Sequence, residues 1–322
     1  MGKLVSRRTA LAALSVPFAS ALTSCLGNDW DSFPPSTFTV ATGNPGGVFA
    51  RYGEALSTVI GRRLTGVSAR AKLTDASVQN LRMVSDGTCD LGFALGDAAA
   101  DAARGTGAFD TALGVVALAR TYDSFVHLVV PGDSPISAVA HLRGQRVGLG
   151  ATGSGTRVVA QRILRQNGLD LSDIDVSSDP LQASAEALID GSMSAFFFVS
   201  GIPNQAVLSL SRRVPIRLVS LKDVVEPMTA DYGPQYVGGP IPASTYGLSG
   251  AVDTVSVKNY LVVARDMTAK LAYAVTRVMF EAEDEIDRLA PGVPTPNLAA
   301  AIFTSPLDLH PGAVRYYREQ RV

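Results

Sequence analysis

The chain has 322 residues, of which 47% are hydrophobic and 18% are charged, and its formal net charge is −1. This length allows one large core or two smaller ones, and the composition is that of an ordinary globular protein. Because the charge is nearly balanced, aromatic residues are few and no basic run occurs, we expect no nucleic-acid partner.

An export signal is predicted at the start of the chain, over residues 1–24. Lys3, Arg7 and Arg8 give it a positive beginning, and the apolar run over 9–21 is too short to span a bilayer comfortably. The paired arginines are typical of the twin-arginine export route, but the residues after them fit that signal only in part. Both this route and the general secretory (Sec) route therefore stay open.

The signal ends in Leu22-Thr-Ser-Cys25, which resembles a bacterial lipobox. A lipobox implies cleavage before Cys25 and attachment of a lipid to its thiol. We therefore expect an extracytoplasmic protein held at the cell membrane by its lipid anchor, with 25–36 as a tether. Lipidation leaves Cys89 alone, so we expect no intramolecular disulfide and a buried, apolar role for this thiol.

From 38 to 118 the chain alternates between strands and helices. A β-branched strand over 38–42 leads into a glycine loop over 43–47, and a helix with an apolar face follows. Strand patterns recur over 67–73, 91–95 and 113–118, and we expect Asp75 to cap a helix between the first two. Such alternation predicts a parallel sheet with helices on both of its faces.

A second glycine loop, over 148–157, follows an apolar strand and precedes a helix that begins near Thr156 and ends at Gly168. The free N–H groups and the dipole of a helix N-terminus favour an anion, and no Glu or Gln is placed to form a capping box. The same residues match GxGxxG. A small-anion site, a dinucleotide site and a plain strand–helix turn therefore all stay open at this point.

The two halves of the chain have a similar order of elements. The stretches 75–86 and 179–190 have the same spacing between two Asp residues, and each second Asp precedes a Gly and then an apolar strand. We therefore predict an α/β fold with two lobes around a central cleft, where ligands bind at the carboxyl ends of the strands. Lobe 1 comprises 37–126 plus 257–322, and lobe 2 comprises 127–256.

The connections between the lobes are predicted at two apolar strands, 125–130 and 257–263. Between them, 232–256 is rich in Gly and Pro, and we expect it to form a long ordered loop that lines the cleft. Hinge closure of the two lobes around a ligand is the expected motion.

Several motifs in this order resemble the TAXI-type solute receptors, which are extracytoplasmic binding proteins of TRAP transporters. The resemblance covers 38–319 and combines a glycine loop with its aromatic residue, a Ser-Val-x-Asn, a Gly-Ser-Gly-Thr-Arg loop, a Gly-x-Pro and a C-terminal His-Pro-Gly-Ala with Tyr-x-x-Glu. Their positions here are 42–49, 77–80, 153–157, 201–203 and 310–319.

This resemblance implies a type II periplasmic-binding-protein fold, a TRAP-type membrane permease as partner, and a small carboxylate or amino acid such as glutamate as ligand. Two positions depart from the family pattern. Ala76 stands where the family usually has Gly, and Gly96 stands where a Ser often precedes Asp97. Both are expected beside the cleft, so the ligand could differ from the family's usual one.

Arg157 and Arg120 are candidate cations for a ligand carboxylate, and Asp97 could hold a ligand ammonium or cap a helix. The candidate ligand-binding residues are Gly43, Asn44, Gly47, Val48, Phe49, Ser77, Val78, Asn80, Asp97 and Arg120 from lobe 1, and Thr152, Gly153, Ser154, Gly155, Thr156, Arg157, Phe198 and Gly201 from lobe 2.

Enzyme functions fit the sequence poorly, because it has no GxSxG elbow and no metal-ligand spacing such as HExxH or paired CxxC. We predict no catalytic residue, no metal and no cofactor, since an exported protein has little access to dinucleotides. The predicted function is capture of a small organic anion or amino acid and its delivery to the permease. A ligand-sensing lipoprotein that docks on a receptor kinase is the alternative.

Overall fold

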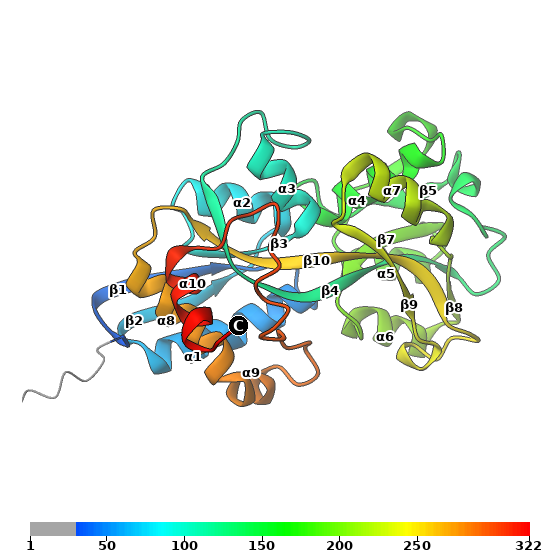
Figure 1. Ribbon diagram of the computed structural model, residues 1–322. Coiled ribbons are helices and arrows are strands. Elements are labelled where there is room, and N and C mark those ends of the chain that lie inside the picture. Colours follow the sequence, from blue (N-terminus) through cyan, green and yellow to red (C-terminus); the bar gives the residue numbers. More distant parts are fainter. Residues whose placement is uncertain (1–29) are drawn as a thin grey trace, which may run out of the picture.

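The computed structural model describes residues 30–322, so the predicted signal, its lipobox and Cys25 lie outside the described residues. Figure 1 shows two lobes side by side, and two long strands run from one lobe into the other. These strands are β4 (Val115–Pro131) and β10 (Val252–Ala264). The predicted α/β architecture with two lobes is therefore confirmed.

Lobe 1 is built from both ends of the described chain. Its first part alternates strands and helices, and its last part adds three helices that pack beside α1 (Figure 1). The elements are β1 (Ser32–Ala41), α1 (Val48–Arg63), β2 (Thr65–Lys72), α2 (Ser77–Ser85), β3 (Leu91–Leu95), α3 (Gly96–Arg104), α8 (Ala269–Glu281), α9 (Glu283–Leu289) and α10 (Pro311–Glu319).

Lobe 2 lies between β4 and β10 in the chain. Its parallel strands β5, β6 and β7 carry helices on both faces. The elements are η1 (Val139–Leu142), β5 (Arg146–Gly148), α4 (Gly155–Gln166), η2 (Leu171–Asp173), β6 (Asp175–Ser177), α5 (Leu181–Ile189), β7 (Ala195–Ser200), α6 (Gln205–Arg213), β8 (Ile216–Leu218), η3 (Lys222–Val224), α7 (Val225–Tyr232), β9 (Tyr236–Ile241) and η4 (Ala243–Thr245).

One mixed sheet continues through both lobes in the order β2-β1-β3-β10-β4-β7-β5-β6. The first part of β4 pairs with β10, whereas its last part pairs with β7 and β8. In the same way β10 pairs with β9 in lobe 2 and with β3 in lobe 1. Each lobe thus shares its sheet with the other, and within residues 30–322 the backbone passes between the lobes only in these two strands.

Separate apolar clusters support the two lobes. In lobe 1 the buried face of α1, with Tyr52, Leu56 and Val59, packs with side chains of α8 and α10. In lobe 2 the buried face of α4, with Val159 and Ile163, packs with side chains of β4, β7 and β10. Cys89 is free and 2% exposed, as expected of a thiol with an apolar role.

Four expectations for local structure are wrong. Strand β1 begins at Ser32, inside the predicted tether, because 32–36 pairs with β2. The strands predicted over 113–118 and 125–130 are parts of the single strand β4. The helix after Asp75 has Ala76 at its N-cap position, so Asp75 does not cap it. The stretch 232–256 contains β9, which pairs with β10 and is not part of a cleft-lining loop.

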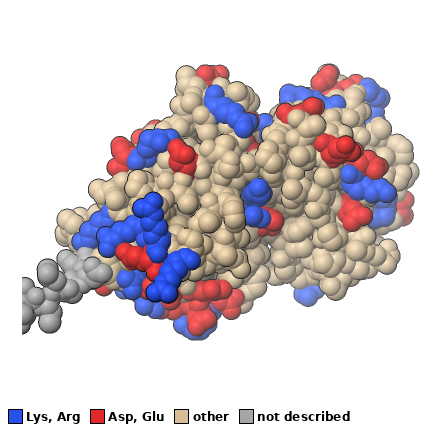
Figure 2. Space-filling model, in the orientation of Figure 1, with Lys and Arg blue, Asp and Glu red and all other residues tan. Residues whose placement is uncertain are grey.

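The surface carries charges of both signs in small groups. On the face drawn in Figure 2, positive and negative groups alternate, and much of the surface between them is uncharged. None of the helices within residues 30–322 is long and apolar enough to cross a bilayer.

Candidate ligand-binding site

A pocket lies between the lobes, where the N-termini of α1, α2 and α4 meet. Its volume is about 30 Å³, which is room for about two water molecules. The lining residues are Gly43, Asn44, Gly47, Val48, Phe49, Ala76, Ser77, Leu95, Tyr122 and Ser124 from lobe 1, and Ser154, Gly155, Thr156, Phe198, Val199 and Ser200 from lobe 2.

The N-terminus of α4 supplies hydrogen-bond donors to the pocket. Ser154 is the N-cap residue, and its hydroxyl oxygen accepts a bond of 3.1 Å from the N–H of Arg157. The N–H groups of Gly155 and Thr156 precede the first intrahelical donors, and they have no acceptor within 30–322. The expectation of free amide groups at this helix is therefore confirmed for two of its first three residues.

Close packing explains why residue 155 is a glycine. A Cβ atom there would lie 2.6 Å from the hydroxyl oxygen of Ser77 and 2.6 Å from a methyl group of Leu95. The backbone of α4 in lobe 2 thus approaches side chains of lobe 1 directly, and the pocket is closed from both sides.

The N-terminus of α1 enters the pocket from lobe 1. Its N-cap residue, Gly47, has no side chain to cap the helix, and its own N–H donates to the carbonyl oxygen of Asn44 over 3.1 Å. The N–H groups of Val48 and Phe49 have no acceptor within the described part of the chain. Two helix N-termini from opposite lobes therefore direct partial positive charge and free donors towards the same space.

The third helix, α2, is capped by the opposite lobe. The carbonyl oxygen of Gly153 accepts hydrogen bonds from the N–H groups of Val78 and Gln79, each at 3.1 Å. Its N-cap residue Ala76 has φ = 81°, a conformation that strains any residue other than glycine. Lobe 2 therefore contributes part of the N-terminal cap of a lobe 1 helix in this closed arrangement.

No lining residue of the pocket carries a formal charge. Tyr122 is 7% exposed, and its hydroxyl has no hydrogen-bond partner among residues 30–322. Burial raises the pKa of this hydroxyl well above its ordinary value, and the nearby Tyr52 hydroxyl adds to the increase. Tyr122 therefore stays protonated and has a free donor.

A cluster of buried charges joins the lobes outside the pocket. Arg162 of α4 lies 2.6 Å from Asp101 and 3.4 Å from Asp97, both on α3. The Tyr236 hydroxyl donates to Asp97 over 2.6 Å, and the Tyr232 ring lies 4.4 Å from the guanidinium. Burial raises the pKa of the Asp97 carboxyl, and attraction to Arg162 opposes this increase. We call these residues the ion cluster.

A chain of neutral hydrogen bonds makes another contact between the lobes. The imidazole of His127 is buried, and it bonds the Phe125 carbonyl and the Tyr246 hydroxyl, each over 2.9 Å. The same hydroxyl accepts the N–H of Asn204, whose side-chain amide reaches the carbonyl of Gly46 in lobe 1 at 3.5 Å. Burial lowers the pKa of His127 to about 4. We call this chain the neutral relay.

Ten of the predicted ligand-binding residues line the pocket, and they come from both glycine loops and from the ends of neighbouring elements. They are Gly43, Asn44, Gly47, Val48, Phe49, Ser77, Ser154, Gly155, Thr156 and Phe198. The other eight do not line it, namely Val78, Asn80, Asp97, Arg120, Thr152, Gly153, Arg157 and Gly201.

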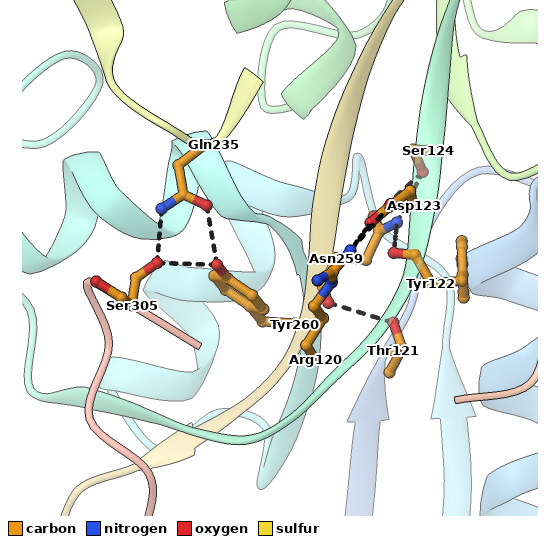
Figure 3. A network of polar contacts seen from close by, with 9 residues as sticks. All are labelled: Arg120, Thr121, Tyr122, Asp123, Ser124, Gln235, Asn259, Tyr260 and Ser305. Atoms are coloured by element: carbon orange, nitrogen blue, oxygen red, sulfur yellow. Dashed lines mark hydrogen bonds and ion pairs between the residues drawn. The ribbon is translucent and has the colours of Figure 1, made fainter. Parts of the chain in front are cut away.

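Both predicted cations point elsewhere. Arg157 donates to the Ser178 hydroxyl over 2.9 Å on the exposed side of α4. Arg120 lies in the middle of β4, because that strand continues past it. Its Nη2 atom donates to both carboxylate oxygens of Asp123, over 2.8 and 2.9 Å (Figure 3). The predicted arginine clamp on a ligand carboxylate is therefore wrong for this arrangement.

Predicted polar contacts in lobe 1 are used within the fold. The Asn80 amide donates to the carbonyls of Thr42 and Phe93, over 2.6 and 2.8 Å, and its oxygen accepts from Thr74. Asp97 belongs to the ion cluster and does not cap α3 by its side chain. These side chains fix the loops around the pocket and do not reach into it.

The remaining candidates from lobe 2 act through their backbone or lie outside. Thr152 is exposed, and Gly153 contributes its carbonyl to α2. Gly201 packs on Tyr122, where a Cβ atom would lie 3.0 Å from the ring.

Six lining residues were not among the candidate ligand-binding residues, although one of them, Ala76, was expected beside the cleft. Leu95 and Ser200 end parallel strands, so the rule that ligands lie at carboxyl ends of strands could have found both. Tyr122 and Ser124 lie within β4, and no local signal distinguishes them from core positions. The other two are Ala76 and Val199.

The two departures from the family pattern differ in their surroundings. Ala76 lines the pocket, as expected. Gly96 does not, because a Cβ atom there would lie 2.8 Å from the side-chain oxygen of Gln235. Gln235 bonds Tyr260 and the Ser305 carbonyl, a network beside β10 that Figure 3 shows. The expectation that Gly96 lies at the cleft is therefore wrong.

A search of family models matches residues 40–320 of this chain to a model described as the NMT1-like family.

Several solved structures share the fold at low identity. The alkanesulfonate-binding protein SsuA from Xanthomonas axonopodis pv. citri, bound to MOPS, is 17% identical, covers 89% of this chain and 84% of its own, and has a TM-score of 0.51. A Xanthomonas citri protein bound to a chloride ion is 14% identical over 88% and 95% of the two chains, with a TM-score of 0.52.

A third structure is a binding protein component of an ABC phosphonate transporter from Pseudomonas aeruginosa. It is 11% identical over 82% of this chain and 80% of its own, with a TM-score of 0.53. Together these likenesses show that the chain has the periplasmic-binding-protein fold.

Proposed function

The chain belongs to the NMT1-like family, and we propose that it is an extracytoplasmic solute-binding protein that captures a small organic ligand between its lobes and delivers it to a membrane transporter. The observation that carries this proposal is the pocket between the lobes, which both lobes line and which has free donors from α1 and α4. Binding between two lobes that share a two-stranded connection suits capture by closure.

The small volume of the pocket fits this mechanism. At about 30 Å³ the closed arrangement excludes an organic ligand of ordinary size. A ligand therefore enters when the lobes part. The two lobes then close on the ligand as far as its size allows, about the two strands that connect them.

The transporter in this proposal is of the TRAP type, because the motifs over 42–49, 77–80 and 153–157 resemble those of TAXI receptors. The two solved structures named for alkanesulfonate binding and for an ABC phosphonate transporter are only 17% and 11% identical to this chain. They share its fold, and they do not decide which type of transporter is its partner. A lipid on Cys25 would hold the protein beside the permease at the outer face of the membrane.

Thermal unfolding in the presence of a library of small carboxylates, sulfonates, phosphonates and amino acids tests the proposal. A ligand that binds the folded state at a concentration of 100 Kd stabilises it by about 2.7 kcal/mol, which raises the melting temperature measurably. Intrinsic tryptophan fluorescence is a poor reporter, because Trp30 stacks on Arg277 in lobe 1, away from the pocket lining. If no compound in the library gives a saturable increase, the proposed function fails.

A further inference from the structure

The two strands that connect the lobes lose their regular pairing where they cross. Between Lys258 and Tyr260 of β10 the register with β4 shifts by one residue. Asn259 therefore lies opposite two residues of β4, Thr121 and Tyr122, and neither of these has a partner in the register with β10. An extra residue of this kind is a β-bulge, which bends a strand and interrupts its ladder of hydrogen bonds. We call 121–122 the bulge.

The other neighbours of both strands change close to the bulge. β10 pairs with β9 up to residue 257 and with β3 from residue 259. β4 pairs with β7 only from residue 125 onwards. The bulge is therefore the least paired part of the crossing, and the backbone can bend there at a smaller loss of ladder hydrogen bonds than in the stretches on either side.

Asn259 is a buried polar side chain that spans the bulge (Figure 3). Its amide nitrogen donates to the carbonyl oxygen of Tyr122 over 2.7 Å, and its backbone carbonyl accepts from the Thr121 hydroxyl over 3.4 Å. The Ser124 hydroxyl lies 3.0 Å from the amide nitrogen and 3.2 Å from the amide oxygen. The side chain thus supplies hydrogen bonds where the ladder is interrupted, so the amide is satisfied although it is buried.

The residues that Asn259 holds also belong to the pocket. Tyr122 and Ser124 both line it, whereas Asn259 itself does not. The curvature of β4 at the bulge therefore sets the angle between the lobes and the position of these two lining residues together.

Resting on the proposed function, in which the lobes close on a ligand, we infer that the bulge is the hinge and that Asn259 is a positioning residue that holds it in its closed curvature. Asn259 acts through the carbonyl of Tyr122 and the hydroxyl of Ser124. Without its amide, the Tyr122 carbonyl loses this donor in the closed arrangement, and water can reach the carbonyl when the lobes part. Removal of the amide therefore favours the open arrangement.

Hydrogen exchange of backbone amides, measured by NMR on the protein without ligand, tests the inference. The N–H groups of Val78 and Gln79 donate to the carbonyl oxygen of Gly153 in the opposite lobe. They lie in the first turn of α2, so they lose this acceptor and gain no intrahelical one when the lobes part. Their exchange reports opening, whereas the amides of Leu56 in α1 and Ile163 in α4 report unfolding within each lobe.

We expect Asn259→Ala to accelerate exchange at Val78 and Gln79 about tenfold beyond any change at the two reference amides, because the closed arrangement then contains a buried carbonyl without this donor. Ser124→Ala leaves the bond to Tyr122 in place, and we expect about threefold.

Thr254→Val is the matched control. It also removes a buried side chain of β10 that donates to a carbonyl of β4, that of Val126 over 2.7 Å, but it lies away from the bulge. We expect it to give no selective acceleration at Val78 and Gln79.

Unchanged exchange at Val78 and Gln79 in Asn259→Ala overturns the inference. Equal acceleration at the opening and reference amides also overturns it, because Asn259 then serves general stability. The selective pattern in Thr254→Val would overturn the position of the hinge. If Asn259→Ala does not fold, Ser124→Ala decides by the same criteria. No ligand is present in this experiment, so its failure is distinguishable from a failure of the ligand library that tests the proposed function.

Discussion

The ion cluster and the pocket both join the two lobes, but they satisfy their polar groups in opposite ways. In the ion cluster, Arg162 is surrounded by Asp97, Asp101 and the Tyr236 hydroxyl at distances of 2.6 to 3.4 Å. In the pocket, the backbone N–H groups at the starts of α1 and α4 have no acceptor within 30–322, and no lining side chain is charged. The ion cluster pairs its charges within the protein, although the Asp97 Oδ1 atom has no hydrogen-bond partner within 30–322, whereas the N–H donors of the pocket are left open to a guest.

This difference separates closure from recognition. Buried charges that pair with one another hold the lobes in one relative position, because any displacement leaves a charge without its partner. Backbone N–H groups without acceptors do not hold the lobes together, and they select a ligand by its charge and shape. Variants that remove one kind of contact should therefore change either stability or ligand selection.

The largest effect is expected from Arg162→Ala. This change leaves Asp97 and Asp101 buried with no cation, and loss of one partner of a buried pair costs about 3–5 kcal/mol of unfolding free energy. Urea unfolding monitored by circular dichroism measures the loss. The matched control is Arg213→Ala, which removes an exposed pair with Glu186 and should cost at most about 1 kcal/mol.

The same variant should respond to pH. Burial already raises the pKa of Asp97, and without Arg162 the largest opposing influence is lost, while the hydrogen bond from Tyr236 remains. A carboxyl whose folded pKa lies above its unfolded pKa favours folding at low pH and loses this contribution as pH rises. The deficit of Arg162→Ala should therefore be smaller at pH 5 than at pH 8. If Arg162→Ala lost no more unfolding free energy than Arg213→Ala at pH 5 and at pH 8, the role of the ion cluster would be contradicted.

The neutral relay should give the opposite dependence on pH. Burial lowers the pKa of His127 from 6.5 to about 4. The unfolded state therefore binds more protons than the folded state between these pH values. The free energy of unfolding that the neutral His127 contributes is fully present above about pH 6.5 and is lost as pH falls towards 4. By linkage it amounts to about 3 kcal/mol at most.

Comparison of the wild type with His127→Asn isolates this contribution. Stability measured by urea unfolding should fall less between pH 7 and pH 5 in the variant than in the wild type. His310, whose pKa burial also lowers, contributes to both proteins and cancels in the difference. The same slope in both proteins would mean that His127 is not buried as a neutral group.

The sequence predicts the place of the site better than its chemistry. A strand, a glycine loop and a helix form a repeated local pattern, so both loops of the pocket and ten of its residues were predictable. The direction of a side chain at a helix start is set by tertiary contacts. Arg157 was therefore predicted as a clamp, although it turns outward to Ser178.

Continuity of strands was the other source of error. β4 passes through polar residues at its centre, where it crosses between lobes, so its sequence reads as two strands and places Arg120 at an end. β9 contains Gly238, Gly239 and Pro240 and pairs with β10, and such residues read as loop although a strand at a sheet edge tolerates them.

The smallest expected effect is that of Ala76→Gly, which tests strain at the pocket without changing any charge. Ala76 has φ = 81° and ψ = −139°, which costs a residue with a Cβ atom about 1–3 kcal/mol. Glycine relieves this strain but loses about 0.4–1 kcal/mol through the greater freedom of the unfolded chain. The net expectation is a gain of about 1 kcal/mol in unfolding free energy, measured by urea unfolding.

Ala183→Gly, at an exposed position of α5 with helical backbone, is the matched control and should lose about 1 kcal/mol. Losses of the same sign in both variants would mean that Ala76 is not strained, and the departure from the family's glycine would then have no conformational cost.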